Sequence, residues 1–382
     1  MDRKYLEDYD KSQIESPAFI IDIDALKRNL QVLDCIQRDA GVNVLLALKG
    51  FSTVKAFDSI KQVLKGVCAS SLHEARLGRE YFGKEVHTYS PAYQESKFDE
   101  IVSYSDHLVF NSVQQWEQFR EKCPSELSVG LRLNPEHSET ETPLYDPCAP
   151  GSRLGIRSKD LEGVDLSGVE GFHMHTLCQR DSFALERTFE AAEKKFGHHF
   201  QNLKWLNFGG GHKITHKDYD VDHLITFLKK VKSDYNLEIY LEPGEAVVWE
   251  TGLLLCTVLD IVPGDIPSAI LDISVTCHMP DVLEMPYQPD LEGATIGKDK
   301  KYAYRLGGMS CLAGDVAGVY SFDKPLEIGQ QLEFLDMSQY TTVKTTTFNG
   351  VALPSVYSVE NKGVKVNKLQ EFGYKDFLSR LL

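Results

Sequence analysis

The sequence predicts an α/β protein with an N-terminal (β/α)8 TIM barrel and a C-terminal antiparallel β domain. Short apolar segments typical of buried strands recur between residues 44 and 243, and segments with helical periodicity separate them. Eight such strand–helix repeats within about 230 residues match a (β/α)8 barrel. From residue 252 onward the helical periodicity fades, and β-branched and aromatic residues dominate, which predicts a second domain of a different class.

The expected barrel strands lie at 44–48, 66–70, 86–90, 107–111, 129–134, 171–175, 205–209 and 238–243. Helical periodicity is found at 24–38, 71–82, 113–122, 184–196 and 221–235. In barrels of this type the functional site sits at the C-terminal ends of the strands. The reactive or turn-forming groups that end the strands are therefore expected to converge: Lys49, Ser70, Ser90, Asn111, Asn134, His175, Gly209–Gly211 and Glu242.

The β domain is expected to contain strands at 252–262, 269–274, 331–336, 340–348 and 351–359. An N-terminal strand at 18–22 precedes the first helical segment and is expected to pair with this domain. The resulting division is a barrel over residues 25–251 and a β domain formed by residues 1–24 together with 252–382.

Composition excludes several classes of function. The formal net charge of −15 argues against a nucleic-acid partner, because phosphate binding requires an excess of Lys and Arg. Residues 1–8 contain no apolar signal core, and no apolar run approaches the roughly 20 residues of a membrane span. The eight cysteines form no Cys-x-x-Cys pair and are expected to be free thiols. We therefore expect a cytoplasmic protein without a membrane partner.

Lys49 is the most informative residue of the chain. It follows the apolar stretch Val44–Leu48 and precedes Gly50 and Phe51. Lysine is rarely buried without a partner. Its amine could extend to solvent from the strand end, or it could form a Schiff base with a carbonyl cofactor such as pyridoxal phosphate.

Three further groups at strand ends each allow more than one interpretation. The run Gly209–Gly211 suits a phosphate, because its backbone N–H groups are unobstructed, but it also suits a tight turn. His173 and His175 share one face of a strand, so one of them could stack on a flat cofactor, both could bind a metal with Glu242, or both could be core residues. Glu242 could pair with a protonated pyridine nitrogen or lie exposed at the barrel end.

In the second domain, Cys311 lies in the small-residue segment 310–315. A cysteine in such a turn could donate a proton with a shifted pKa. It could equally be a small buried apolar residue.

Taken in order, the chain resembles the fold-type III pyridoxal-phosphate-dependent decarboxylases, which include ornithine, diaminopimelate and arginine decarboxylases. The motifs that carry the resemblance are Leu46–Lys49, Phe172–His175, Phe208–Gly211, Glu242–Gly244, Cys311 with Asp315, Tyr340 and Thr347–Gly350. The resemblance implies the alanine racemase-like combination of barrel and β domain, pyridoxal 5′-phosphate as cofactor and no metal. It also implies a homodimer in which the two sites share residues.

The resemblance also implies roles for individual residues. Lys49 would be the Schiff-base lysine, His173 would stack on the cofactor ring, and Glu242 would face the pyridine nitrogen. Gly209, Gly210, Gly211 and Tyr340 would bind the phosphate. Cys311, supplied across the dimer, would protonate the carbon that has lost carbon dioxide.

Two departures from the family pattern bear on the substrate. Glu245 occupies the position of the arginine in the common Glu-Pro-Gly-Arg motif, and Leu312 replaces the aspartate that follows the catalytic cysteine in ornithine decarboxylases. The acids Glu245, Asp281 and Asp315 suit a substrate with more than one amine. We therefore expect decarboxylation of a polyamine that carries an α-carboxylate.

Three other functions remain open on sequence grounds. One is a decarboxylase of ornithine, lysine, arginine or diaminopimelate on the same scaffold. Another is a catalytically silent regulatory homologue. A barrel metallohydrolase that uses His173 and His175 is the third.

Overall fold

The computed structural model describes Leu6, residues 9–140 and residues 142–382. The chain divides into two compact units: unit 2 is Arg28–Val247, and unit 1 combines Met1–Lys27 with Val248–Leu382. The sequence placed the two boundaries at 25 and 251, and the structure places them at 28 and 247. One domain is thus inserted into the other, because the chain leaves unit 1 before the barrel and returns to it afterwards.

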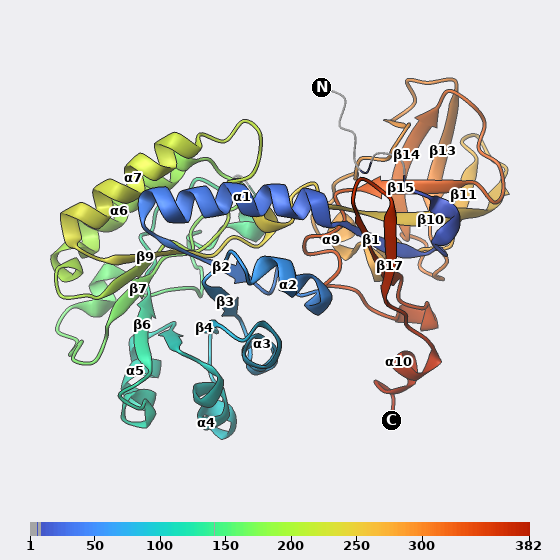
Figure 1. Cartoon of the computed structure of the whole chain (residues 1–382). Coiled ribbons are helices and arrows are strands. Elements are labelled where there is room, and N and C mark those ends of the chain that lie inside the picture. The colour runs from blue at the N-terminus through green and yellow to red at the C-terminus, as the bar shows by residue number, and fades with distance from the viewer. Residues whose placement is uncertain (1–5, 7–8, 141) are drawn as a thin grey trace. The chain divides into compact units, whose positions relative to one another are not determined.

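Unit 2 is a closed parallel barrel (Figure 1). Within the described part of the chain its strands, in barrel order, are β2 (Asn43–Ala47), β3 (Gly66–Ala69), β4 (Glu85–Tyr89), β5 (His107–Phe110), β6 (Ser128–Arg132), β7 (Gly171–His173), β8 (Trp205–Asn207) and β9 (Glu238–Leu241). Closure is made by β9 pairing with β2, with Val44 opposite Leu241. All eight strands expected from the sequence are confirmed, and each ends one or two residues earlier than expected.

Helices lie between the strands of the barrel. They are α2 (Phe57–Ile60), α3 (Leu72–Leu77), α4 (Glu95–Tyr104), α5 (Val113–Phe119), α6 (Ser182–Phe200) and α7 (Val221–Tyr235), preceded by α1 (Ile23–Ala40). Two long helices, α6 and α7, run side by side on the outside of the barrel (Figure 1). Each begins at an aspartate whose side chain accepts from a backbone N–H of the first turn, Asp181 for α6 and Asp220 for α7.

The interior of the barrel is filled by large side chains from its strands. Leu45, Val109, Trp205 and Tyr240 form one buried cluster. Trp205 fits because the neighbouring strands carry glycine, and a Cβ at Gly171 would lie 1.9 Å from the indole ring. The interior is therefore a packed core, and the strand ends are left to carry chemistry.

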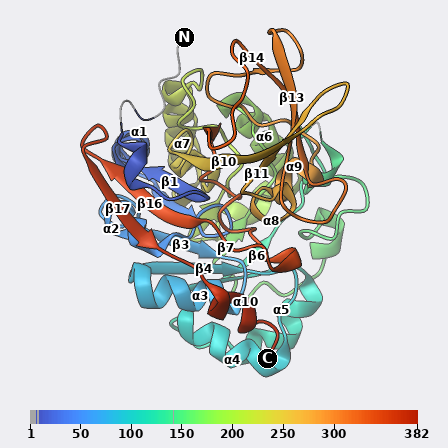
Figure 2. The same ribbon diagram turned by 90° about the vertical axis from the view of Figure 1, so that its right-hand side faces the viewer.

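Unit 1 contains a nine-stranded sheet in the described residues. The strand order is β12-β14-β13-β11-β10-β1-β16-β17, and β15 pairs with β10. The bounds are β1 (Ala18–Asp22), β10 (Gly252–Val262), β11 (Ser268–Leu271), β12 (Thr295–Ile296), β13 (Tyr302–Gly307), β14 (Val316–Phe322), β15 (Gln331–Leu335), β16 (Ser355–Glu360) and β17 (Lys365–Gln370), with short helices α8 (Val275–His278), α9 (Pro280–Glu284) and α10 (Tyr374–Leu378). The antiparallel pair β13–β14 of this sheet is visible in Figure 2.

The sheet of unit 1 is mostly antiparallel, as expected. The strand at 18–22, β1, pairs within this unit as the sequence suggested, and its partners are β10 and β16. Two pairs are parallel, β1 with β16 and β11 with β13. The expected strand at 340–348 is wrong: this segment forms turns and ends in a short 3₁₀ helix, and Tyr340 has a φ of 51°. A positive φ is incompatible with a regular strand, so the β-branched composition of the segment misled the prediction.

Two further findings concern the whole chain. All eight cysteines are free thiols. Among the described residues, no helix combines the length and the apolar composition that a membrane crossing requires.

Candidate active site

Lys49 lies two residues beyond the end of β2, in a turn at the C-terminal edge of the barrel. The turn packs closely on the one that follows β9, because a Cβ at Gly50 would lie 2.9 Å from the Cα of Gly244. This close approach needs glycine on both sides. It places the ends of β2 and β9, the first and last strands of the barrel, next to each other. The Lys49 amine also lies 3.3 Å from Nε2 of His175, which follows β7.

The second ring nitrogen of His175 fixes the tautomer of this residue. The backbone N–H of Gly210 donates to Nδ1 at 3.1 Å, so Nδ1 carries the lone pair. Burial and the charge of Lys49 lower the pKa of His175 well below its usual value, which keeps the ring neutral. The proton of the neutral ring is therefore on Nε2, the ring nitrogen that faces the Lys49 side chain.

His173 and Glu242 form the second group of the site. His173 ends β7 and is 2% exposed; its Nε2 donates to Glu242 Oε2 at 3.2 Å. Asn207, the last residue of β8, donates to Glu242 Oε1 at 2.7 Å. Burial opposes ionisation of Glu242, but the imidazoles of His173 and His87 and these hydrogen bonds lower its pKa to about 2. The carboxylate is thus ionised at neutral pH inside the barrel.

The two histidines of β7 and its extension have different partners. His173 faces Glu242 and lies near the Tyr89 ring, with centroids 5.5 Å apart and planes at 25°. His175 lies beyond the end of the strand and contacts Lys49 and Gly210. The two rings therefore do not act as a chelating pair in this structure. In the described residues, the cluster of metal-ligand type is a different one, Glu85 with His87 and His107.

The glycine run Gly209–Gly211 is required by the close packing of its backbone, whether or not a phosphate binds there. Gly209 and Gly211 have φ of +66° and +86°, and a Cβ at Gly211 would lie 2.0 Å from the carbonyl oxygen of Leu177. The N–H of Gly209 donates to Asn207 Oδ1, and that of Gly210 to His175 Nδ1. Two of the three amides expected to face a phosphate are thus used within the protein, where they orient Asn207 and His175.

Glu245 follows β9 and opens a short 3₁₀ helix, Glu245–Val247. Its Oε1 accepts a hydrogen bond of 2.7 Å from the Gln179 amide. Burial raises its pKa, although the Gln179 hydrogen bond and the charge of Lys213 act in the opposite direction. A partly desolvated acid with an uncharged partner is suited to receive a cation.

The remaining expected site residues belong to unit 1. Cys311 is exposed, and its backbone N–H donates to Asn349 Oδ1 at 2.8 Å. Asp315 is 3% exposed, and its two carboxylate oxygens accept from the N–H groups of Thr276 and Ser310 at 3.0 Å. Asp315 therefore shapes the loop that presents Cys311.

Asp281 begins a different network of unit 1. Its carboxylate and that of Glu284 both pair with the ammonium group of Lys344. The two acids raise the pKa of Lys344 against the effect of its partial burial. In this structure Asp281 is thus already neutralised by a cation of the chain itself.

Sequence reasoning missed two residues that hold the site together. Asn207 links Glu242 to Gly209, and Arg132 donates to the His175 carbonyl at 2.8 Å while its guanidinium lies over the Tyr89 ring. Both lie at or next to the C-terminal end of a barrel strand, which is the signal that could have found them.

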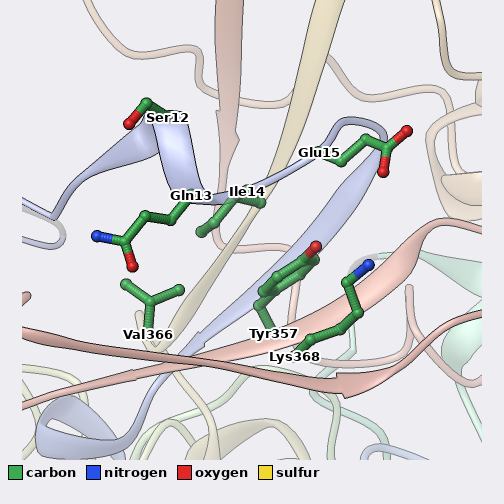
Figure 3. Close-up of a pocket in the computed structure, with 7 residues that line it drawn as sticks. All are labelled: Ser12, Gln13, Ile14, Glu15, Tyr357, Val366 and Lys368. Carbon is green, nitrogen blue, oxygen red and sulfur yellow. The ribbon is translucent and has the colours of Figure 1, made fainter.

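A pocket of about 350 Å³ in unit 1 does not involve these residues (Figure 3). It is lined by residues 12–15 together with Tyr357, Val366 and Lys368. None of the expected site residues lines it, so we assign it no part in the site.

A parallel barrel with a lysine after its first strand and an ionised carboxylate after its last, joined to a mostly antiparallel β unit, defines an alanine racemase-like decarboxylase of fold type III. Known proteins agree. A carboxynorspermidine/carboxyspermidine decarboxylase of Campylobacter jejuni is 45% identical over 379 residues, which cover 96% of this chain and 99% of that protein. The carboxyaminopropylagmatine decarboxylase of Synechocystis is 44% identical over 379 residues, with 98% of both chains covered.

Solved structures give the same result. The crystal structure of carboxynorspermidine decarboxylase from Campylobacter jejuni complexed with norspermidine has a TM-score of 0.90 at 44% identity, covering 96% of this chain and 100% of that one. A diaminopimelate decarboxylase with a TM-score of 0.83 at 18% identity, covering 97% of this chain and 94% of that one, shares the fold. No protein-family model matches the chain. The chain belongs to the family of carboxynorspermidine/carboxyspermidine decarboxylases, and it is an enzyme of polyamine biosynthesis.

Proposed function

We propose that this enzyme removes the α-carboxylate of carboxynorspermidine, and of carboxyspermidine, to give norspermidine and spermidine. The observation that carries the proposal is that Lys49 and Glu242 follow two adjoining strands of the barrel, β2 and β9, in a chain 45% identical to an enzyme named for these two substrates. The norspermidine complex of the similar structure supports a polyamine in this type of site.

The residues present fit pyridoxal 5′-phosphate as the cofactor. An ionised, buried Glu242 needs a cationic partner, and a protonated pyridine nitrogen would supply one. The Nδ1 of His173 is buried and has no hydrogen-bond partner among the described residues, which leaves a polar atom of the site for a bound group to satisfy. Lys49 would hold the aldehyde carbon. Gly211 and Tyr340 would hold the phosphate, since the amides of Gly209 and Gly210 are engaged by Asn207 and His175. When bound, this cofactor withdraws the electron pair left behind by carbon dioxide.

The chain's own residues then have separate tasks. His175, held by the Gly210 N–H, lies 3.3 Å from the Lys49 amine and so positions that amine at the strand ends. Asn207 and His173 fix both oxygens of Glu242, which keeps the carboxylate ionised and oriented. These contacts pre-organise the site before a substrate arrives.

Cys311 is proposed to deliver the proton that replaces the carboxylate, across a homodimer with shared sites. Its exposure on unit 1, in a loop held by Asp315, supports this role. Mixing the variants Lys49→Ala and Cys311→Ala, each inactive alone, should restore about a quarter of wild-type activity, since half of the dimers would be mixed and each would carry one intact site. If each protomer is self-sufficient, the mixture will stay inactive.

Free thiols suit a reducing compartment, so we place the reaction in the cytoplasm.

We propose that Glu245 contacts the distal amine of the substrate. Asp281 is paired with Lys344, and Asp315 accepts hydrogen bonds from backbone amides, so we propose no direct substrate contact for these two acids. Glu245→Gln should raise KM for carboxynorspermidine about tenfold and change kcat little, because the lost contact is a charge-assisted hydrogen bond worth about 1.5–3 kcal/mol. Glu162→Gln, at an exposed position of the same unit, is the matched control and should leave KM unchanged.

A second candidate substrate is carboxyaminopropylagmatine, which is favoured by the 44% identity to the Synechocystis enzyme. Its guanidinium could be held by Glu245 through two parallel hydrogen bonds. The deciding measurement is carbon dioxide release from carboxynorspermidine, carboxyspermidine, carboxyaminopropylagmatine, ornithine, lysine, arginine and diaminopimelate, each supplied separately. The highest kcat/KM for a carboxy-polyamine supports the proposal, and the highest kcat/KM for a simple amino acid overturns it.

A further inference from the structure

A buried cluster of ligand-type side chains lies inside the barrel, away from the C-terminal strand ends. Glu85 is the first residue of β4, and His107 is the first residue of β5. His87 is directly opposite His107 in the strand pairing, so both imidazoles project to the same side. Their rings lie 3.8 Å apart and nearly parallel, at 11°.

The polar atoms of this cluster are poorly satisfied. Among the described residues, both ring nitrogens of His87, Nδ1 of His107 and Oε2 of Glu85 are buried and have no hydrogen-bond partner. His87 is 2% exposed and packs against Tyr240, and His107 packs against Trp205. Buried polar atoms in native proteins are almost always partnered. Three side chains with this deficit in one place indicate an occupant.

The geometry indicates what the occupant is. One oxygen of Glu85 lies 3.4 Å from Nε2 of His107 and 3.8 Å from Nε2 of His87, and all three ligand atoms lie within 4.8 Å of one another. In a tetrahedral zinc site with bonds of about 2.0–2.1 Å, neighbouring ligand atoms are about 3.4 Å apart. Two imidazoles and one carboxylate form a ligand set that zinc-like ions prefer.

We propose that Glu85, His87 and His107 bind one divalent transition-metal ion of the zinc type, separately from the catalytic site. Binding turns the two imidazoles out of their parallel stack, so that both Nε2 lone pairs point to the ion. The Glu85 side chain is 20% exposed and provides the route of entry from the N-terminal end of the barrel. The ion joins β4 to β5 and has a structural role, because no residue of the catalytic group is a ligand.

The test is titration of chelator-treated holoenzyme with Co²⁺, followed by visible absorption. We expect one equivalent to bind with the intense d–d bands of a tetrahedral N/O site and without the near-ultraviolet bands of thiolate ligation. Zn²⁺ should displace Co²⁺ and raise the melting temperature. Absence of the d–d bands, or binding well below one equivalent, would overturn the proposal.

Variants assign the site. The double variant His87→Gln/His107→Gln should abolish the d–d bands, and Glu85→Gln, at the accessible edge, should weaken Co²⁺ binding at least tenfold while folding normally. The matched control His198→Gln/His199→Gln removes two neighbouring imidazoles from α6, of which His198 is exposed, and should bind Co²⁺ as the parent does. Bands that persist in Glu85→Gln but vanish in the control would place the metal at the surface of α6 and contradict the proposal.

Discussion

At the scale of single residues, the site depends on how one buried group is kept ionised while another is kept neutral. Glu242 is ionised because Asn207 and His173 donate to its two oxygens, whereas His175 is neutral because burial and the charge of Lys49 lower its pKa. Both states are set by neighbours on adjacent strand ends. Each can be altered by a substitution of nearly the same volume.

Glu242→Gln removes the negative charge and keeps the shape. We expect kcat to fall at least about a hundredfold, since a neutral amide cannot keep a pyridine nitrogen protonated and electrostatic groups of this kind are worth about that much. Steady-state kinetics at saturating cofactor, together with the absorbance of the bound cofactor, measure it. Unchanged kcat with intact cofactor content would contradict the role of Glu242.

His175→Phe keeps a buried ring and removes the Nε2–H that faces Lys49. Because the His175 ring contacts the Lys49 amine and positions it, we expect cofactor incorporation into the stripped protein to slow several-fold, with a smaller effect on KM for the substrate. Stopped-flow absorbance during reconstitution measures the rate. His173→Phe is the comparison, and it should change the spectrum of the bound cofactor more than the rate of its incorporation.

At the scale of elements, the strands of the barrel were predictable because burial on both faces leaves a continuous apolar run in the local sequence. The positions of Lys49 and Glu242 at strand ends followed from the same pattern. The pattern put His175 at the end of its strand, whereas the structure ends that strand at His173. The hydrogen bond from Gly210 to His175 did not follow from the pattern, since it joins loops 35 residues apart. The strand predicted at 340–348 was wrong for a related reason. Its β-branched residues favour a strand, but the backbone has a positive φ at Tyr340, where the segment begins, and at Asn349, directly after it.

The glycine loop after β8 gives a prediction at this scale. Gly211→Ala should lower the free energy of unfolding by about 3 kcal/mol or more, because the residue has a positive φ and the new Cβ would lie 2.0 Å from the Leu177 carbonyl. Gly163→Ala has a similar φ of +75° but open space around it, and should cost about 1 kcal/mol. Urea denaturation compares the two, and equal losses would show that the close approach is relaxed at little cost.

At the scale of the whole molecule, both units bury imidazoles that must remain neutral. Burial lowers the pKa of His212 in unit 2 and of His278 in unit 1 to about 4. Since the unfolded chain titrates near 6.5, each contributes stability that is fully present above that pH and is lost as the pH falls toward 4. The protein should therefore lose stability in mild acid through histidines as well as carboxylates.

His212→Gln tests this pH dependence. At pH 5 a pKa of about 4 corresponds to a penalty of about 2 kcal/mol that the variant avoids, so its melting temperature should fall less than that of the parent between pH 7 and pH 5. Thermal denaturation at the two pH values measures it. The exposed His198→Gln serves as control, and a parallel loss in all three proteins would show that His212 is not titrating in this range.

The insertion of the barrel within unit 1 has a consequence for synthesis. Ile21 on β1 pairs with Gly252 on β10, 231 positions later, so the β domain cannot begin its central ladder until the entire barrel has left the ribosome. Closing so long a loop in a disordered chain is entropically costly. A folded barrel removes most of that cost, because the pairing of β2 with β9 brings residues 44 and 241 together. The nascent chain should therefore assemble from its middle outward, and the N-terminal strand waits longest for its partner although it is made first.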